Sequence, residues 1–436
     1  MAKILLIGNG AREHIIAEKL VYSKAKPTLF AYMKANNPGI AKLAEQSVVG
    51  PYSDLDEIER FATSLGVDFV FIGPEEPLGY GVVDVLERAG IACVGPTKEL
   101  ARLETSKSFT RMLTEKYDIE GSPKFKVFSS DDGILEYLKE LGSVVIKADG
   151  LAGGKGVKVQ GDHFETLEEG YTYCKQVLSE HPCVVVEEKL IGEEFSLQSF
   201  TDGKSLFHCP VVQDHKRAYV GDKGPNTGGM GSYSCGGLLP FMTEEDLEAA
   251  KEITDQMRDA LFKETGTLYK GVMYGGFIIT KTGVKLIEFN ARMGDPEALN
   301  VLSIMETDFV ELCLGVISGN IHKVESVFAS KATVCKYAVP EGYPEAPVAD
   351  EKIFLGEVPK EVKYYYASVD KKEDGVYMTG SRAVAFVGVA NALEEAQVLA
   401  EDGVCSAQGK IFHREDIGTA QLVQKRVDHM KSLRSE

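Results

Sequence analysis

The chain has 436 residues. This length is too great for a single hydrophobic core and indicates about two to four domains. Its hydrophobic fraction of 44% and charged fraction of 26% are typical of globular proteins, and no apolar run reaches the roughly 20 residues that span a bilayer. A net charge of −18 disfavours a nucleic-acid partner, and eight dispersed cysteines without a C-x-x-C pair fit a reduced, cytoplasmic protein without a zinc site or disulfide framework.

Residues 1–103 are expected to form a Rossmann-like domain. Short apolar runs predict parallel strands, and helical spacing of apolar residues predicts the helices between them. The predicted strands cover 3–7, 28–31, 47–49, 69–72 and 91–94, and the helices 13–23, 54–65 and 81–89. The opening MAKILLIGNG is accordingly a strand before a Gly-rich turn and not a signal peptide.

The first strand-to-helix turn is a candidate phosphate site, because glycines admit close backbone approach and a helix N-terminus offers free N–H groups. Its candidate residues are Gly8, Asn9, Gly10, Arg12 and Glu13. In GNGAREH, Glu13 stands where a dinucleotide fingerprint has its third glycine, and residues 28–31 supply no acid. The turn therefore suits a monophosphate ligand better than NAD.

A second loop ends another strand at the same carboxyl edge, where such folds bind ligands. It contains Gly73, Pro74, Glu75 and Glu76. Two adjacent carboxylates in a Pro-bounded loop could hold ribose hydroxyls, and a solvated acidic turn is the competing interpretation.

Residues 104–328 are predicted to form the second domain, with a lid subdomain over about 120–192. A helix over 97–115 carries Lys107, and the strand, helix and strand over 125–128, 131–141 and 144–148 lead to Lys147. The Gly-rich stretch DGLAGGKGV follows and continues as a strand over 156–159, so it is not a Walker loop. With Gly153, Gly154, Lys155 and Gly156, it predicts a mobile phosphate lid, and a flexible β-turn is the alternative.

The next strand, over 183–188, ends in a segment that could hydrogen-bond adenine through its main chain. Glu187, Glu188 and Leu190 lie in this hinge, and Glu194, which starts the strand over 195–200, could bind ribose hydroxyls. Further along, Asp214, Lys216 and Arg217 form a mixed-charge group that suits a phosphorylated amino-sugar, whereas His215 alone is more typical of a structural histidine.

Residues 221–234, GDKGPNTGGMGSYS, have almost no apolar content and predict a long loop that carries no core and includes Pro225 and Asn226. A helix over 243–264 leads to a β-hairpin over 277–289, whose second strand ends in Glu288, Asn290 and Arg292. The carboxylate and amide oxygens suit Mg²⁺, and the arginine suits phosphate. An ordinary strand with a solvated loop is the alternative.

After the GDPE loop, residues 298–318 are predicted to be helical. A smaller, strand-rich region over 329–436 follows, with strands over 331–338, 364–369 and 382–389 and a final helix over 393–400. It has no notable polar group in the sequence, so we expect it to give structural support.

These motifs together resemble the glycinamide ribonucleotide synthetases (phosphoribosylamine–glycine ligases) of the ATP-grasp superfamily. The matching segments occur in order along nearly the whole chain: GNGAREH, NPG, GPEEPL, SK (106–107), IKADGLAGGKGV, EEKLIGEEFS, QDHKRAYVGDKGPNTGGMGSYS and IEFNARMGDPE. The resemblance implies an α/β multidomain fold with a Rossmann-like N-terminal domain, an ATP-grasp core with a mobile lid, and a small C-terminal domain. It implies ligation of glycine to 5-phosphoribosylamine in purine biosynthesis, with ATP and Mg²⁺ or Mn²⁺ as cofactors.

The resemblance also assigns roles to the candidate residues. Catalytic positions would be Arg292, Asp295, Lys216 and Asp214. ATP would be held by Lys107, Lys147, Gly153, Gly154, Lys155, Gly156, Glu187, Glu188, Leu190 and Glu194, and the metal by Glu288 and Asn290. Substrates would contact Gly8, Asn9, Gly10, Arg12, Glu13, Gly73, Pro74, Glu75, Glu76, Arg217, Pro225, Asn226 and Glu297.

Two departures from the family pattern bear on these roles. The family reads RFGDPETQ where this chain reads RMGDPEALN, so Met293, Ala298 and Leu299 differ and could alter substrate positioning. Many superfamily members also carry a metal carboxylate near the position of Gly276. The alternatives are an ATP-grasp ligase with another acceptor, a non-catalytic nucleotide-binding module and, least favoured, an NAD dehydrogenase. We expect a monomer or weak homodimer.

Overall fold

The N-terminal sheet is built from apolar runs that alternate with helices. In the computed structural model, which describes residues 2–150 and 156–435, the strands pair in parallel in the order β3-β2-β1-β4-β5. Both faces are covered by helices, so the central strands are apolar and buried except for Lys3 at the start of β1. The strands are β1 (Lys3–Ile7), β2 (Thr28–Met33), β3 (Gln46–Val49), β4 (Phe69–Ile72) and β5 (Ala92–Val94), and the helices are α1 (Ala11–Val21), α2 (Pro38–Leu43), α3 (Leu55–Leu65), α4 (Glu75–Tyr80) and α5 (Val82–Arg88).

Two predictions in this half of the chain were wrong in detail. The segment that contains Glu75 and Glu76 is not a loop: it forms α4, whose first turn these acids occupy, where the helix dipole favours negative charge. The predicted helix over 97–115 is two helices, α6 (Arg102–Thr105) and α7 (Lys107–Lys116). Ser106 separates them in an extended conformation and caps α7 by accepting a hydrogen bond from the Phe109 N–H.

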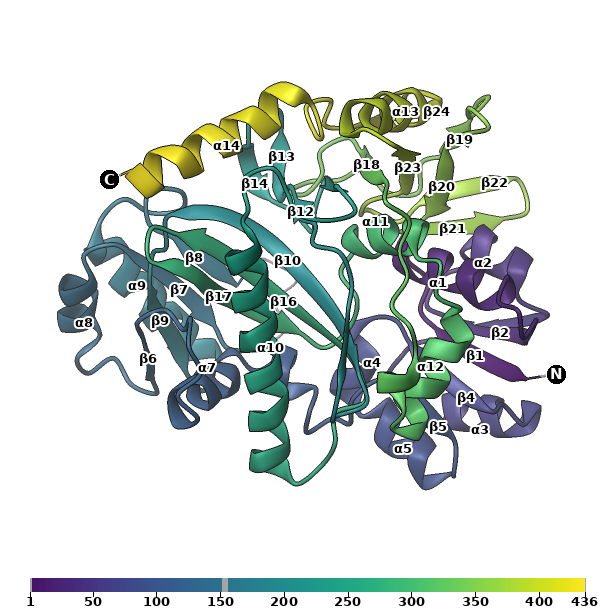
Figure 1. The fold of residues 1–436 in the computed structure, drawn as a ribbon, viewed down its shortest axis with the longest axis horizontal. Helices are drawn as coiled ribbons and strands as arrows, with labels where there is room; N and C mark the ends of the chain where they lie inside the picture. Colours follow the sequence, from purple (N-terminus) through teal and green to yellow (C-terminus); the bar gives the residue numbers. More distant parts are fainter. Residues whose placement is uncertain (1, 151–155, 436) are drawn as a thin grey trace.

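The lid is an antiparallel sheet with a hydrophobic core of its own. Its strands run in the order β6-β9-β7-β8, and its two helices pack on the sheet to bury Ile146, Cys174 and Val186. The elements are β6 (Phe125–Phe128), α8 (Ile134–Leu141), β7 (Val144–Ala148), β8 (Val157–Val159), α9 (Leu167–Glu180) and β9 (Val184–Glu188). In Figure 1 the lid lies at the left, across the molecule from the N-terminal sheet.

A second antiparallel sheet, in the order β11-β10-β16-β17, forms the base opposite the lid, and α10 packs on it (Figure 1). Its elements are β10 (Gly192–Thr201), β11 (Leu206–His208), α10 (Glu244–Thr265), β16 (Gly271–Thr280) and β17 (Gly283–Asn290). The predicted helix over 298–318 is divided into α11 (Glu297–Ile304) and α12 (Phe309–Ser318), because Asp308 starts a new helix by accepting hydrogen bonds from the Val310 and Glu311 N–H groups.

The C-terminal sheet recruits strands from the middle of the chain. It runs β12-β15-β18-β23-β20, with β25 also paired to β18. The prediction that residues 221–234 carry no core was therefore wrong: residues 231–234 form the buried strand β15, which pairs with β18 through its backbone and so does not need large apolar side chains. The elements of the sheet are β12 (Gln213–Asp214), β15 (Gly231–Ser234), β18 (Ala332–Pro340), β20 (Lys363–Tyr366), β23 (Val384–Ala390) and β25 (Ile411–Phe412).

Short hairpins and two helices complete this part of the chain. One of the helices, α14, was not predicted; in Figure 1 it crosses from the C-terminal sheet toward the lid side of the molecule. The remaining elements are β13 (Arg217–Tyr219), β14 (Lys223–Asn226), η1 (Ile321–Lys323), β19 (Phe354–Leu355), β21 (Val369–Lys372), β22 (Gly375–Met378), α13 (Leu393–Cys405), β24 (Ala407–Gln408) and α14 (Ala420–Ser435).

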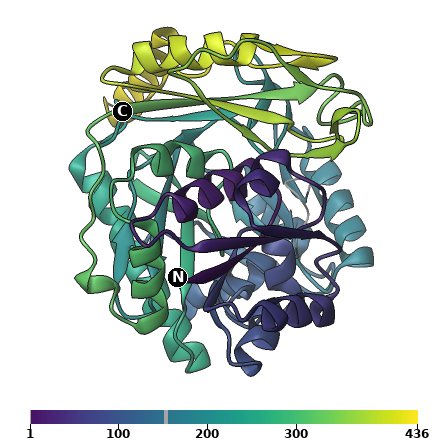
Figure 2. The same cartoon turned by 90° about the vertical axis from the view of Figure 1, so that its right-hand side faces the viewer.

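Helix α1 joins the N-terminal sheet to the rest of the molecule. It packs on α11 and α12 and on β20, and Lys19 Nζ donates to the Met305 carbonyl at 2.7 Å. His14 Nδ1 accepts a hydrogen bond from the Tyr366 N–H at 3.0 Å. Figure 2 shows the C-terminal sheet lying above the N-terminal domain. None of the helices among the described residues has the length and apolar character that crossing a membrane requires.

Candidate active site

A cleft of about 860 Å³ opens where the lid, the base sheet and the N- and C-terminal parts meet. Predicted site residues that line it are Arg12, Glu75, Lys107, Lys147, Gly156, Glu187, Glu188, Leu190, Glu194, Asp214, Lys216, Arg217, Asn226, Glu288, Asn290, Arg292, Asp295 and Glu297. The fold thus gathers side chains from widely separated segments. Gly153, Gly154 and Lys155 lie outside the described residues.

The inner wall of the cleft contains a buried ion network. Arg111 donates to Glu187 through Nε to Oε1 at 2.6 Å and through Nη2 to Oε2 at 3.0 Å, and Lys147 Nζ lies 2.8 Å from the same Oε2. Burial raises the pKa of Glu187, but Arg111 and Lys147 outweigh it and lower the pKa to about 2. The side chain of Glu187 therefore orients Lys147 toward the cleft, a role that the sequence did not indicate. Arg111 was missed, since a lone arginine on a helix carries no signal.

The hinge after β9 retains a free main-chain edge. The Glu188 and Lys189 N–H groups donate to the Lys124 and Ser143 carbonyls within the lid. Among the described residues, no hydrogen-bond acceptor is found for the Leu190 N–H. This group lies at the cleft wall, where the edge of a purine could accept its hydrogen bond.

Lys107 extends from the start of α7 to the entrance of the Gly-rich stretch, where its Nζ donates to the Gly150 carbonyl at 2.8 Å. The neighbouring Asp149 accepts from the Ser108 N–H and hydroxyl at 3.1 and 2.8 Å. The end of β7 is therefore fixed against the N-terminus of α7. This places Lys107 and Lys147 on the same side of the cleft.

Glu288 and Asn290 face the cleft from the end of β17, and Asn290 Oδ1 accepts a hydrogen bond from Arg292 Nη2 at 3.4 Å. Burial raises the pKa of Glu288, but Lys216, Lys147 and Lys107 together lower it, so the carboxylate is ionised. A Cβ at Gly276, on the paired strand, would lie an ordinary 3.6 Å from Glu288 Cγ. A Cβ at this position would therefore fit beside Glu288 without a clash.

A group of carboxylates surrounds Lys216. Its Nζ lies 3.8 Å from Glu194 Oε2, and Asp214 raises its pKa, with smaller contributions from Glu194 and Glu288. Glu297 is buried, which raises its pKa to about 7, and the Tyr274 hydroxyl donates to it at 2.8 Å. Several hard oxygens around one cation suit a divalent metal ion or the amino group of a substrate.

Two carboxylates surround the guanidinium group of Arg292. Its Nη2 donates to Glu104 at 2.9 Å, and its Nε donates to Glu75 at 3.3 Å. Burial raises the pKa of Glu75, but Arg292 and Arg12 lower it to about 2. Burial raises the pKa of Glu104 to about 7, although Arg292 opposes the change. Glu104, which was not predicted, also accepts the Ala291 N–H at 2.7 Å and so fixes the backbone next to Arg292.

The first turn of the N-terminal domain, the predicted phosphate site, is occupied in this structure by a side chain of its own. The Glu13 carboxylate accepts the Gly10 N–H at 2.6 Å and Arg12 Nε at 2.5 Å, so it occupies the helix N-terminus that a phosphate would need. A Cβ at Gly8 or Gly73 would overlap the Glu13 side chain. The glycines thus make room for Glu13, and of the predicted residues of this turn only Arg12 lines the cleft, where its Nη1 donates to the Met293 carbonyl at 2.8 Å.

Three predicted positions beyond the first turn, Gly73, Pro74 and Glu76, also lie outside the cleft lining, as does Asn9 of the turn itself. Asn9 Oδ1 accepts the Tyr52 hydroxyl at 2.5 Å. Glu76 pairs with Lys34 at 2.8 Å in a partly exposed ion pair, and Pro74 is the N-cap residue of α4. These residues shape the edge of the domain, and Glu75 alone of the acidic pair faces the cleft.

The C-terminal part contributes Arg382 to the GDPE loop. Arg382 Nη1 donates to the Asp295 carbonyl at 2.6 Å and to the Gly228 carbonyl at 2.7 Å, and Nη2 lies 3.4 Å from the Asp295 carboxylate. The Tyr337 hydroxyl also donates to Asp295. The expectation that this region lacks notable polar groups was wrong, because arginines scattered along a sequence meet only in the folded chain.

The β13–β14 hairpin forms part of the cleft wall. Arg217 Nη2 lies 2.7 Å from Asp162 of the lid, and its Nη1 donates to the Gly224 carbonyl at 2.9 Å. Asn226 pairs with Arg217 across the hairpin and lines the cleft, whereas Pro225 does not line it. Arg217 thus connects the hairpin to the lid.

The departures from the family pattern lie in the core. Met293, Ala298 and Leu299 are almost fully buried in the main hydrophobic cluster, and none of them lines the cleft. The Met293 carbonyl, not its side chain, contacts Arg12 and Arg292. The expected effect of these residues on substrate positioning therefore has no contact to support it.

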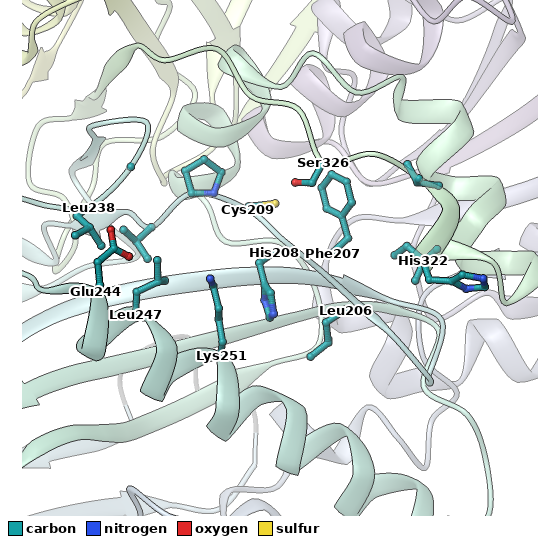
Figure 3. Close-up of a pocket in the computed structure, with 15 residues that line it drawn as sticks. Leu206, Phe207, His208, Cys209, Leu238, Glu244, Leu247, Lys251, His322 and Ser326 are labelled. Atoms are coloured by element: carbon teal, nitrogen blue, oxygen red, sulfur yellow. The ribbon is translucent and has the colours of Figure 1, made fainter.

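A second pocket, of about 470 Å³, lies at the far end of the base sheet (Figure 3). Leu206, Phe207 and Leu247 make much of its wall apolar, and the His208 ring hydrogen-bonds Ser199 at 2.7 Å. None of the predicted site residues lines this pocket. The larger cleft is the candidate active site.

The protein has a lid subdomain opposite a base sheet, with lysines on the lid side of the cleft and carboxylate and amide oxygens suited to a metal ion on the base. This arrangement defines an ATP-grasp protein. Family models match in order along the chain: phosphoribosylglycinamide synthetase N domain over residues 2–104, ATP-grasp (A) domain over 105–298 and C domain over 333–420. The chain belongs to the phosphoribosylglycinamide synthetase family.

Individual relatives agree with this assignment. The phosphoribosylamine–glycine ligase of Methanosarcina barkeri is 49% identical over 433 residues, covering 99% of this chain and 100% of that protein. The enzyme of the same name from Methanopyrus kandleri is 48% identical and covers all of both chains. The crystal structure of a Thermotoga maritima phosphoribosylamine–glycine ligase superposes with a TM-score of 0.81 at 29% identity, over 95% of this chain and 100% of that one.

Proposed function

We propose that the protein ligates glycine to 5-phosphoribosylamine with ATP, giving glycinamide ribonucleotide, ADP and phosphate. Its relatives of nearly equal length carry the name phosphoribosylamine–glycine ligase. The observation that carries the proposal is the single cleft that presents Lys107 and Lys147 opposite Glu288 and Asn290, with the Asp214–Arg217 segment beside them. We further propose domains over 1–103, 104–328 and 329–436.

Two steps follow from this arrangement. The glycine carboxylate attacks the γ-phosphorus of ATP to give glycyl phosphate and ADP, and the amine of phosphoribosylamine then attacks the activated carbonyl and releases phosphate. Lys107, Lys147 and Arg292 hold and neutralise the phosphates, so the chemistry depends mainly on positioning. Closure of the lid excludes water, which would hydrolyse the acyl phosphate.

The residues present fit a divalent cation. Glu288 is ionised, Asn290 offers an amide oxygen beside it, and Glu194, Asp214 and Glu297 surround the nearby Lys216. We propose Mg²⁺, or Mn²⁺ in its place, held by Glu288 and Asn290 together with phosphate oxygens. When bound, the ion neutralises charge that develops on the transferred phosphoryl group.

The substrate side of the cleft follows from the same geometry. Asp214 and Lys216 with Glu297 are proposed to receive glycine and the reacting amine, and Arg217 with Asn226 the phosphoribosyl group. Asp295 is proposed to act from the position that Arg382 gives it. The hinge at Glu188–Leu190 is proposed to receive adenine and Glu194 the ribose. The protein is proposed to act in the cytoplasm on small molecules, without nucleic acid or membrane, as a monomer or weak homodimer.

The test is ADP release with ATP, Mg²⁺, glycine and phosphoribosylamine generated in situ, with each component omitted in turn. We expect release to require both co-substrates and the product to have the mass of glycinamide ribonucleotide. Release that ignores phosphoribosylamine and responds to another amine would refute the proposed acceptor. Tight ATP binding without turnover would refute the proposed catalysis.

A further inference from the structure

One arginine of the C-terminal helix bridges two walls of the cleft. Arg426, on α14, lies 2.5 Å through Nη2 from Asp222 Oδ2 and 3.4 Å through Nε from Glu193 Oε2. Its side chain is only 17% exposed, and Glu193 is nearly buried at 6%. Asp222 belongs to the turn of the β13–β14 hairpin, and Glu193 immediately precedes Glu194 on β10. Arg426 therefore lies between the part of the cleft proposed to bind phosphoribosylamine and the part proposed to bind ATP.

The turn that Arg426 contacts is strained and held by cations. Asp222 has φ 59°, a left-handed conformation that costs a non-glycine residue free energy unless its surroundings stabilise it. Arg414, which is fully buried, donates to Asp222 at 3.1 Å and to the Arg217 carbonyl at 3.0 Å. Lys425 lies 3.9 Å from the same carboxylate. The strain thus persists because basic residues of the C-terminal segment act on Asp222.

The same segment fixes the preceding residue. Arg414 also binds Asp416 at 2.8 Å, and Asp416 accepts the Gly221 N–H at 2.9 Å. Gly221 has φ 76° and follows the β13 strand that starts at Arg217. The conformation of the hairpin turn is therefore set by contacts from outside the hairpin, and the positions of Arg217 and Asn226 in the cleft depend on it.

We propose that Arg426 is a positioning residue for the acceptor substrate. Acting through Asp222, it holds the β13–β14 hairpin so that Arg217 and Asn226 face phosphoribosylamine. Acting through Glu193, it fixes the position of that hairpin relative to the start of β10, where Glu194 faces the nucleotide. The inference rests on the proposed function and extends it by assigning a substrate-orienting role to the C-terminal helix.

The experiment compares Arg426→Met and Arg426→Lys with a matched control on the same helix. Arg434→Met removes a similar pair, since Arg434 Nη2 lies 2.5 Å from Asp246, but neither residue lines the cleft. We expect Arg426→Met to raise the KM for phosphoribosylamine about tenfold or more, with kcat at saturation within about threefold of the unmodified protein. Arg426→Lys should recover part of the loss, and Arg434→Met should leave both constants unchanged.

A double-mutant cycle separates positioning from direct substrate contact. If Arg426 acts through Asp222, then Asp222→Asn should raise the same KM, and the double variant should be little worse than either single one. Additive losses would overturn the proposal, as would a fall in kcat without a change in KM, or equal behaviour of Arg426→Met and Arg434→Met. Failure of the unmodified protein to form glycinamide ribonucleotide would instead refute the proposed function, so the two failures are distinct.

Discussion

Arg292→Met tests whether this arginine serves the reaction or only the fold. The substitution keeps much of the side-chain volume and removes the donors to Glu104, Glu75 and Asn290. If Arg292 neutralises charge on the transferred phosphoryl group, its loss should reduce kcat while ATP still binds through Lys107, Lys147 and the hinge.

The structure predicts different magnitudes for the loss of stability and the loss of activity. Removing one partner of a buried ion pair typically costs about 3–5 kcal/mol of stability. Here Glu104, with a pKa of about 7, can accept a proton at neutral pH, so we expect a loss of about 1–3 kcal/mol, mainly from broken hydrogen bonds. Loss of a donor aimed at developing charge reduces kcat by about 10²–10³-fold. The catalytic loss should therefore exceed what a partly unfolded population could explain.

The assay is coupled ADP release at saturating glycine and phosphoribosylamine, with ATP titrated and stability followed by urea unfolding. Arg258→Met is the control, because Arg258 is a nearly buried arginine of α10 that pairs with Asp255 and Asp259 outside the cleft. We expect kcat to fall about 10²–10³-fold for Arg292→Met, with the KM for ATP within about threefold. A KM that rises as much as kcat falls would refute a role confined to the transition state.

Other predictions follow from the pKa of one carboxylate, the metal site and the GDPE loop. Because the folded-state pKa of Glu187 is about 2, below the ordinary 4.5, its contribution of about 3 kcal/mol is present above pH 4.5 and lost as pH falls toward 2. The unfolding free energy of Glu187→Gln, from urea titrations, should therefore fall less steeply between pH 5 and 3, and an equal slope would contradict this. Glu288→Gln should raise the Mg²⁺ concentration for half-maximal activity about tenfold or more, and an unchanged titration would exclude Glu288 as a ligand. Arg382→Met should lower kcat/KM about tenfold or more by releasing Asp295, whereas retained activity would assign Arg382 to packing.

Local sequence patterns predicted the strands of the N-terminal and lid sheets well, whereas the short strands of the hairpins were not predicted. The strands 3–7, 69–72, 125–128 and 144–148 have the predicted bounds, because short runs rich in apolar residues stand between polar segments. Breaks within helical patterns were harder to predict. Ser106 and Asp308 interrupt predicted helices because their side chains cap a new helix, and capping competes with helix continuation by only about 1 kcal/mol.

The motifs indicated which segments meet at the site, but not how their side chains pair. Glu288 and Asn290 could be predicted because a strand places alternate residues on one face. The buried ion pairs of Glu187 could not be predicted, since its partners Arg111 and Lys147 are distant in sequence. The sequence indicated only a main-chain role for this residue. The role of Arg382 could not be predicted either, because its partners are backbone carbonyls of two segments that lie 87 and 154 residues away.

The separate core of the lid has a thermodynamic consequence. Phe128, Ile146, Cys174 and Val186 belong to a hydrophobic cluster made of lid residues and separate from the main core, an arrangement that favours opening or local unfolding of the lid as a unit. In the proposed function nucleotide binds the ordered lid, so its apparent dissociation constant would equal the intrinsic value divided by the ordered fraction. A cavity cut into this small core, far from any phosphate, would therefore weaken nucleotide affinity in proportion to the disordered population, and saturating nucleotide would restore the lid by mass action.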